Sequence, residues 1–532
     1  MDKTTHPDDP EWNFIAAFEN GQEVPEPINC TVSGSLPFWL SGKLYRTGPA
    51  IYDTLDSKRK VTLEHWFDGI GITHKFEIHN DQKVTYRNCI TGKQRLKSIG
   101  ERGLKGARTF GPANDPCKTL FEKVSSFFSD GGHEDNVNVS VSPHFVVPGS
   151  KEPLLVLKTD ANLLQVLDPE TLEPVKGGIQ NYGLLNELSN APLSLAHEEL
   201  DPVKNTFMNV VAAPGPKPEF IVFEQSQLPG AGPAEILAKF HDPDMYYQHS
   251  FISTTKYVVV PLWPIMYAWR GAKILTSSSL TDAMEWNPHK LTRFIVIDRA
   301  LKKVVTEYQG PAEFCFHTVN AFDDENGDIV MDFIMYQSGE VVRKFMLADV
   351  RSSSADSKSV AELRELTETR FKRMKLGAVK EAIAAYIPGR VLATDAPVAG
   401  VVFDNPISME LPRINPTWKH RPDYRYTYGV GATQREKHSH VIFDSLVKFD
   451  ARTQTHAIWS KVGFSPSEPI FVARPGGTEE DDGVVISVVL DGMLRRSFLL
   501  VLDARTMQEV GRADVGIALP YGLHGSFVSN LL

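Results

Sequence analysis

The chain has 532 residues and a mass of 59.3 kDa; 42% of the residues are hydrophobic and 23% are charged. This balance excludes a disordered, collagen-like or coiled-coil protein and predicts a chain that buries a large core. The net charge of −10 at pH 7 argues against nucleic acid as a partner, because phosphate backbones attract positive charge.

Membrane-spanning and secreted classes are also disfavoured. The longest uncharged apolar run, Tyr257 to Trp269, has 13 residues and two prolines, whereas a bilayer-spanning helix needs about 20 residues. The first residues, MDKTTHPDDPEWNF, lack a secretory pattern, which predicts a cytoplasmic protein. The four cysteines lie far apart without a CxxC pair, so we expect neither a disulfide framework nor a thiolate metal site.

Short segments rich in β-branched and aromatic residues recur from Leu44 to Phe527, and no Gly/Ser-rich or Pro-rich linker divides them. The clearest predicted strands are 154–158, 292–298, 330–336, 446–449, 483–490 and 497–503. We therefore expect residues 1–532 to form one all-β domain.

Four turns share an aspartate that directly follows an apolar strand end: Asp168, Asp298, Asp450 and Asp503. An aspartate at the first position of a turn accepts hydrogen bonds from the backbone. The separations of 130 residues (168 to 298) and 152 residues (298 to 450) suit two blades of roughly 65–75 residues each. The pattern favours a β-propeller, and the alternative is a chance recurrence of aspartate at turns.

One segment departs from the strand pattern. Residues 352–359 are serine-rich, and residues 361–386 place apolar and charged side chains at helical spacing. We expect 351–390 to be a loop and helical insertion within the propeller. Its basic residues are expected on a solvated helix face or against an anionic lipid surface; they are Arg370, Lys372, Arg373 and Lys375.

Four of the sixteen histidines lie at the edge between an apolar strand and a turn: His197, His249, His317 and His524. They are separated by 52, 68 and 207 residues, and the last separation is close to three times 69. This spacing predicts one contribution per blade, converging on the propeller axis. Four neutral imidazoles suit Fe(II), copper or zinc, and two open octahedral positions would favour iron that reacts with O₂. The alternative is four histidines that make ordinary hydrogen bonds.

Three acidic residues lie in otherwise apolar, strand-like surroundings: Asp160, Glu410 and Glu468. A buried charge is costly unless it is paired, and metal-bound imidazoles commonly donate their second N–H to a carboxylate. We expect these three acids to orient the histidines, with exposed strand positions as the alternative.

Taken together, these features resemble the carotenoid cleavage oxygenases. The likeness begins at 40–49 (LSGKLYRTGP) and 65–71 (HWFDGIG) and continues through 135–139 (DNVNV) and the Asp168 turn. It closes with 479–485 (EEDDGVV) and 520–527 (PYGLHGSF). Each motif is short, and their shared order and spacing over nearly the whole chain carry the resemblance.

The resemblance implies a seven-bladed β-propeller with a helical and loop dome over an axial Fe(II) site. Its iron ligands would be the four histidines, oriented by Glu410, Glu468 and Asp160; at the last position the family usually has a glutamate. The implied reaction is O₂-dependent cleavage of a carbon–carbon double bond in a lipophilic polyene, a carotenoid or apocarotenoid, to give aldehydes.

Two alternatives remain open. The segment 282–288 (DAMEWNP) is most similar to fungal carotenoid- and torulene-cleaving members, whereas a stilbene-cleaving enzyme would place a lysine and a tyrosine on the phenol. Lys158 lies near this position but one residue out of register. The alternative from another class is a non-catalytic propeller that binds partners and holds no metal.

A substrate dissolved in lipid predicts peripheral contact with membranes or lipid droplets. Candidates for an apolar mouth, with core packing as the alternative, are Phe121, Phe127, Phe128, Trp263, Ile265, Met266, Tyr267 and Trp269. His438 and His440 have no companion ligands nearby, and we expect them to be dispensable for iron binding.

Overall fold

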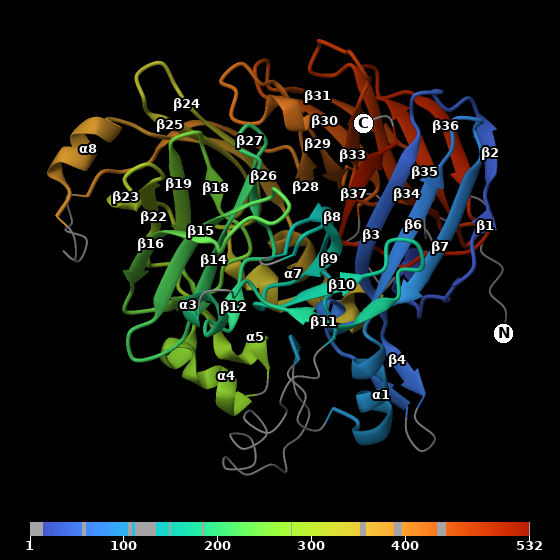
Figure 1. Cartoon of the computed structure of the whole chain (residues 1–532), viewed down its shortest axis with the longest axis horizontal. Helices are drawn as coiled ribbons and strands as arrows, with labels where there is room; N and C mark the ends of the chain where they lie inside the picture. The colour runs from blue at the N-terminus through green and yellow to red at the C-terminus, as the bar shows by residue number, and fades with distance from the viewer. Residues whose placement is uncertain are drawn as a thin grey trace.

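The computed structural model describes residues 14–55, 60–104, 109–111, 135–147, 150–183, 186–277, 279–351, 358–387, 396–433 and 443–530. Within these ranges the strands form seven sheets of four or more strands each, together with two smaller sheets (Figure 1). The inner strands of successive sheets lie against one another around a common axis. The all-β propeller that the sequence predicts is therefore confirmed.

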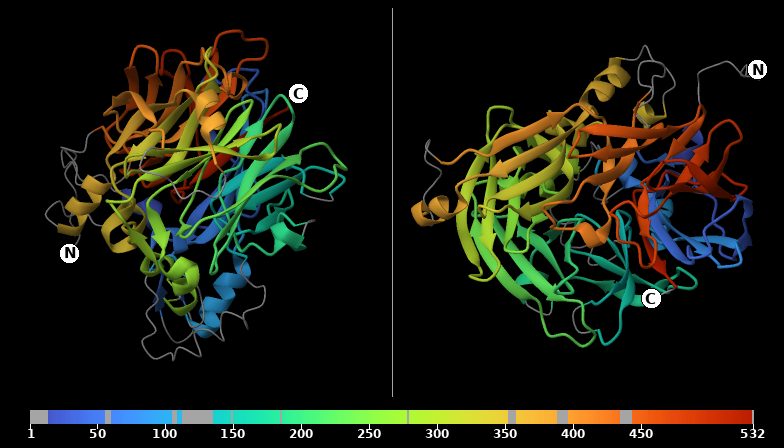
Figure 2. Two further views of the ribbon diagram at one scale, coloured as in Figure 1. Left: turned by 90° about the vertical axis from the view of Figure 1, so that its left-hand side faces the viewer. Right: turned by 90° about the horizontal axis from the view of Figure 1, so that it is seen from above.

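The first and seventh blades join the two ends of the chain (Figure 2). Blade one has the order β1 (Ile28–Asn29), β7 (Val84–Ile90), β6 (Ile70–Ile78), β3 (Gly42–Ile51) and β37 (His524–Ser529). Blade seven comprises β2 (Thr31–Gly34), β36 (Glu509–Asp514), β35 (Arg496–Asp503), β34 (Gly483–Asp491), β32 (Phe464–Pro466) and β33 (Ile470–Ala473). Blades one and seven each pair strands from the N-terminal part of the chain with strands from the C-terminal part. These strand pairings, β3 with β37 and β2 with β36, hold the ring closed.

The intervening blades follow in chain order. Blade two is β8 (Ser140–Phe145), β9 (Leu154–Lys158), β10 (Leu164–Leu167) and β11 (Pro174–Gln180). Blade three is β12 (Leu193–Ser194), β13 (Glu199–Asp201), β14 (Thr206–Ala213), β15 (Glu219–Ser226) and β16 (Glu235–His241). Blade four is β18 (Ile252–Ser253), β19 (Tyr257–Leu262), β22 (Thr292–Asp298) and β23 (Lys303–Gly310).

Blade five is β24 (Phe314–Asp323), β25 (Ile329–Tyr336), β26 (Thr369–Leu376) and β27 (Gly400–Asn405). Blade six is β28 (Glu410–Arg413), β29 (Tyr426–Gly431), β30 (Ser445–Asp450) and β31 (Thr455–Ser460). The smaller sheets are β17 (Met245–Tyr246) with β20 (Ile265–Tyr267) and β21 (Met284–Trp286), and β4 (Asp53–Leu55) with β5 (Lys60–Thr62).

The four predicted aspartate turns occupy equivalent places in four blades. Each joins the third strand from the axis to the fourth: β10 to β11, β22 to β23, β30 to β31 and β35 to β36. In each turn an aspartate Oδ1 accepts the backbone N–H groups two and three positions later. The N–H four positions later bonds to the aspartate carbonyl at 2.8 Å. The repeated sequence pattern therefore corresponds to a repeated hairpin.

We expect Asp503→Ala to lower the free energy of unfolding by about 1 kcal/mol, because Arg505 and Thr506 lose the acceptor of their backbone N–H groups. Asp503→Asn keeps an acceptor oxygen and is the matched control. Urea denaturation measures both variants, and equal losses in the two would contradict this role of the turn.

The predicted insertion at 351–390 is only partly helical. The helices α7 (Lys358–Leu366) and α8 (Val379–Ala385) flank the strand β26, which pairs with β25 along its whole length. The helical prediction is wrong over β26, because acids around this sheet stabilise its basic side chains. The ion pairs are Arg370–Asp404, Lys372–Glu313, Arg373–Asp332 and Lys375–Asp324. The basic cluster is therefore part of a blade rather than of a helix face.

Several short helices lie on one side of the sheets. Figure 1 shows α1 (Lys93–Arg102), α4 (Ala272–Ser277) and α5 (Leu280–Ala283) beneath the blades. Their residues Ile99, Ile274 and Ala283 belong to the largest cluster of buried side chains, which continues into the propeller. Among the described residues, no helix combines the length and apolar character that crossing a bilayer requires.

Candidate metal centre

The four predicted histidines meet at one point. One ring nitrogen from each of His197, His249, His317 and His524 lies within 4.8 Å of the corresponding nitrogen of every other. The centres of neighbouring rings are 4.4 to 5.2 Å apart. Histidines from distant stretches of the chain therefore form one compact cluster.

Each blade contributes one residue to this cluster or to the acids around it. Blade one supplies His524, blade two Asp160, blade three His197, blade four His249, blade five His317, blade six Glu410 and blade seven Glu468. His317 and His524 are 207 residues apart in sequence and three blades apart around the ring. The two blades between them supply Glu410 and Glu468 instead of histidines. The predicted spacing of one contribution per blade agrees with this arrangement.

Register shifts in two inner strands set the direction of the His317 and Glu410 side chains. The register of β24 against β25 shifts between Cys315 and Thr318, which flank His317. The register of β28 against β29 shifts after Glu410, where Leu411 has a φ of 49°. Bulges of this kind turn a side chain away from the alternation of a regular strand, and here the turned side chains face the axis.

A carboxylate accepts a hydrogen bond from Nδ1 of three of the histidines. The distances are 3.0 Å from His249 to Asp160, 2.6 Å from His317 to Glu410 and 2.8 Å from His524 to Glu468. A ring that donates through Nδ1 in its neutral form carries its lone pair on Nε2. These bonds therefore leave the Nε2 atoms of the three rings free to act as metal ligands.

The shorter side chain of Asp160 reaches its histidine. Its carboxylate also accepts the hydroxyl of Tyr247 at 3.0 Å and the backbone N–H of Ala196 at 3.3 Å. Together with His249, these donors fix the carboxylate from three directions. An aspartate can therefore serve at the position where the resemblance implies a glutamate.

The two glutamates are ionised despite their burial. Burial raises the pKa of Glu468, but Arg413, His524 and Arg46 outweigh this effect and hold the pKa far below its usual value. Arg413 Nε donates to Glu468 at 2.8 Å. Burial likewise acts to raise the pKa of Glu410, and His317, with other donors, holds it below the ordinary value. Both groups are therefore anionic acceptors at neutral pH.

Two of the rings have pKa values that keep them neutral. Burial lowers the pKa of His524 to about 4, in spite of the Glu468 carboxylate beside it. Burial and then the three other imidazoles lower the pKa of His197 well below 6.5. Neutral imidazole is the form that binds metals.

The arrangement fits a divalent metal ion. The Nε2 atoms of His317 and His524 lie 3.2 Å apart, close to the roughly 3 Å expected for two nitrogens at right angles on one ion. Nε2 of His197 is buried and has no hydrogen-bond partner among the described residues. A buried polar atom without a partner is costly, and a metal ion would satisfy it.

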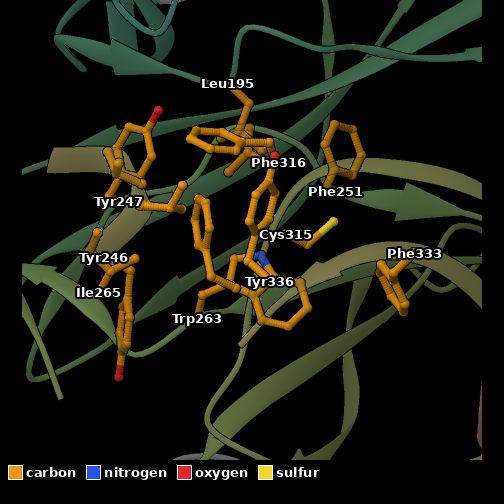
Figure 3. Packing of buried hydrophobic residues seen from close by; sticks show 14 of the residues in the cluster. Leu195, Tyr246, Tyr247, Phe251, Trp263, Ile265, Cys315, Phe316, Phe333 and Tyr336 are labelled. Carbon is orange, nitrogen blue, oxygen red and sulfur yellow. The ribbon is translucent and has the colours of Figure 1, made fainter. Parts of the chain in front are cut away.

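A cavity of about 800 Å³ opens from the cluster, and His249, His317 and His524 are among its lining residues. Ligand pockets span roughly 300–1,000 Å³, so this cavity is large enough for an extended molecule. Aromatic side chains form a large part of the lining, among them Phe67, Phe110, Tyr247, Phe316, Tyr336 and Phe345. Figure 3 shows Tyr247, Phe316 and Tyr336 within the cluster of buried side chains that also contains Trp263.

The candidate mouth residues differ in their exposure. Trp269 is 68% exposed and lines the cavity, as a mouth residue should, whereas Trp263 and Ile265 are 1% and 0% exposed and belong to the core. For these two the alternative of core packing holds, because the apolar run of 257–269 begins inside β19. Tyr267 is buried and lines the cavity. Phe121, Phe127, Phe128, His438 and His440 lie outside the described residues.

Lys158 does not line the cavity. Its ammonium group is paired with Glu198 and also bonds to Ser142, and the lining residue at this point is Thr159. A lysine that binds a phenol would have to reach the substrate. The stilbene alternative is therefore not favoured.

The fold and the site together define a β-propeller with a four-histidine centre on its axis and an aromatic cavity beside it. The chain matches the family model described as retinal pigment epithelial membrane protein over residues 17–529. It therefore belongs to this family, that of the carotenoid cleavage oxygenases.

Individual relatives agree with this assignment. The chain is 31% identical to a carotenoid dioxygenase of Neurospora crassa, over 97% of this chain and 91% of that protein. It is 32% identical to a torulene dioxygenase of Fusarium fujikuroi, over 97% and 93% of the two chains. A solved structure of a Synechocystis apocarotenoid oxygenase variant, 22% identical, aligns over 97% of this chain and 98% of the other with a TM-score of 0.76. The last likeness supports the fold.

Proposed function

We propose that the chain is an Fe(II)-dependent dioxygenase that cleaves a carbon–carbon double bond of a carotenoid or apocarotenoid to give two aldehydes. The observation that carries this proposal is the meeting of four imidazoles beside a large aromatic cavity. Relatives named carotenoid dioxygenase and torulene dioxygenase, similar over nearly their whole length, support the substrate class.

In this proposal His197, His249, His317 and His524 hold the metal, and Asp160, Glu410 and Glu468 orient the rings. Four neutral ligands leave the dipositive charge of the ion uncompensated in the first coordination sphere, and imidazole suits iron. When bound, ferrous iron supplies the one-electron chemistry that lets O₂ react with a double bond.

The rest of the site positions the substrate. The aromatic side chains around the cavity can hold a conjugated chain without charged contacts, since apolar burial contributes about 25 cal/mol per Å². The register of the polyene in the cavity selects the bond that lies next to the histidines. Both atoms of O₂ enter the product as the oxygens of the two new carbonyl groups, so the overall reaction needs no net transfer of protons.

The proposal is tested with iron-loaded protein and a panel of β-carotene, torulene, apocarotenals and resveratrol. We expect about one iron per chain and aldehyde products from at least one polyene, with ¹⁸O from ¹⁸O₂ in both products. A protein that binds no iron would support the non-catalytic propeller, and cleavage of resveratrol alone would support the stilbene alternative.

We also propose that the cavity mouth contacts a membrane surface, because Trp269 projects from it into solvent. We expect Trp269→Ser to weaken co-sedimentation with phosphatidylcholine liposomes roughly tenfold, since an exposed tryptophan would bury much of its surface in the interface. Phe38→Ser is the control, because Phe38 is 79% exposed but does not line the cavity. Equal effects of the two changes, or no binding by the unmodified protein, would contradict the proposal.

A further inference from the structure

A buried ion pair lies next to the histidine cluster. The side chains of Lys158 and Glu198 are 2% and 9% exposed, and Nζ of Lys158 donates to Oε1 of Glu198. Ser142 Oγ donates to the same oxygen at 3.0 Å and is itself bonded to Lys158. The three side chains form a closed triangle. Neither Lys158 nor Glu198 lines the cavity, so neither is placed to touch a substrate there.

The pair joins two segments that carry residues of the metal centre. Lys158 ends β9, two residues before Asp160, and Glu198 directly follows His197. Two further bonds tie the same segments: Ala196 N–H donates to Asp160 at 3.3 Å, and Ser140 Oγ donates to the Ala196 carbonyl at 3.1 Å. The ion pair is thus the charged member of a contact between the second and third blades.

His197 differs from the other three histidines. Those rings each donate to a carboxylate, whereas no carboxylate bond to the ring of His197 is found in the described part of the chain. Glu198 directly follows His197 in the segment between β12 and β13. Its ion pair therefore fixes the backbone beside the His197 ring, which has no carboxylate contact of its own among the described residues.

Stability alone does not account for the pair. Removing two charges from water is costly, and apolar residues of similar volume often replace a buried ion pair without loss of stability. What a charged pair adds is a fixed geometry, since its partners must stay within bonding distance.

We propose that Lys158 and Glu198 are positioning residues that hold the His197 ring in the orientation in which Nε2 binds the metal. This inference rests on the proposed metal centre. The pair acts through the backbone on either side of His197, in place of the direct carboxylate bond that orients each of the other rings.

The test compares the double variant Lys158→Met/Glu198→Leu with the unmodified protein. We expect a similar melting temperature, 10–100-fold weaker binding of Fe(II) or Co(II), and a changed visible spectrum of the Co(II) form. With iron, kcat should fall while KM changes little, because the cavity is untouched. A folded double variant with unchanged affinity and an unchanged Co(II) spectrum would overturn the inference.

Two further comparisons keep the test decisive. A second buried pair, Lys448 and Asp481, is joined at 2.7 Å with side chains 8% and 11% exposed, and neither residue lines the cavity. Lys448→Met/Asp481→Leu should therefore leave metal affinity unchanged. If Lys158→Met/Glu198→Leu does not fold, two single variants replace it. Lys158→Arg should retain metal affinity and Glu198→Gln should lower it; equal affinities in these two would contradict the inference.

Absence of metal binding by the unmodified protein would instead refute the proposed function itself.

Discussion

Replacing His524 by alanine is expected to abolish both iron binding and polyene cleavage. In the proposed site this variant loses one of four metal ligands, the one whose Nε2 lies 3.2 Å from that of His317, and a site with four donors and open positions has none to spare. We expect iron content below a tenth of that of the unmodified protein and activity reduced more than roughly 100-fold. Metal analysis and product quantification measure the two effects.

The matched control for this change is His289→Ala, because His289 is exposed and lies outside the cavity. It should leave iron content and activity unchanged. Circular dichroism and a melting curve should show that the His524 variant keeps its fold. Full iron content in a folded His524→Ala protein would show that this histidine is not a ligand.

The second large effect is expected for Glu468→Ala, which removes the acceptor shared by His524 and Arg413 and the charge next to Arg46. Arg46 is buried, and breaking a buried charge contact by removing one partner typically costs 3–5 kcal/mol. We expect a loss of about 3 kcal/mol in the free energy of unfolding and 10–100-fold weaker metal binding. Urea denaturation and metal titration measure the two quantities.

Glu480→Ala is the control that separates the loss of stability from the loss of metal affinity. Glu480 is also buried, and it accepts the backbone N–H groups of Arg425 and Tyr426, away from the histidines. We expect this variant to be destabilised and to keep its metal affinity. Similar losses of metal affinity in both variants would mean that general destabilisation, rather than the orientation of His524, explains the result for Glu468.

The strand pattern and the metal-site candidates were accessible from sequence for different physical reasons. The predicted strands at 154–158 and 292–298 agree with β9 and β22, because short runs of apolar and β-branched side chains suit strands that are buried on both faces. The histidines stood out by their place at strand edges and by spacing that matches steps around the ring. Burial of an acid among apolar residues identified Glu410 and Glu468, because such a charge needs a partner.

Other features depended on contacts between distant segments. The strand β26 was predicted as helix, since its basic residues find their acids only when the sheet is assembled. The alternation in its sequence is incomplete, because Phe371 and Met374 are three residues apart and only Met374 and Leu376 keep a spacing of two. The register of β26 against β27 shifts at the same place, between Arg373 and Met374. The contacts that Arg413, Tyr247 and the Lys158–Glu198 pair make near the histidines were not predicted, because nothing in their local sequence links them to a histidine.

X-ray absorption at the iron edge of the loaded protein tests the central claim most directly. The account predicts four imidazole nitrogens at about 2.1 Å around a single ferrous ion. A shell with fewer than three imidazoles, or one dominated by carboxylate oxygens, would contradict it.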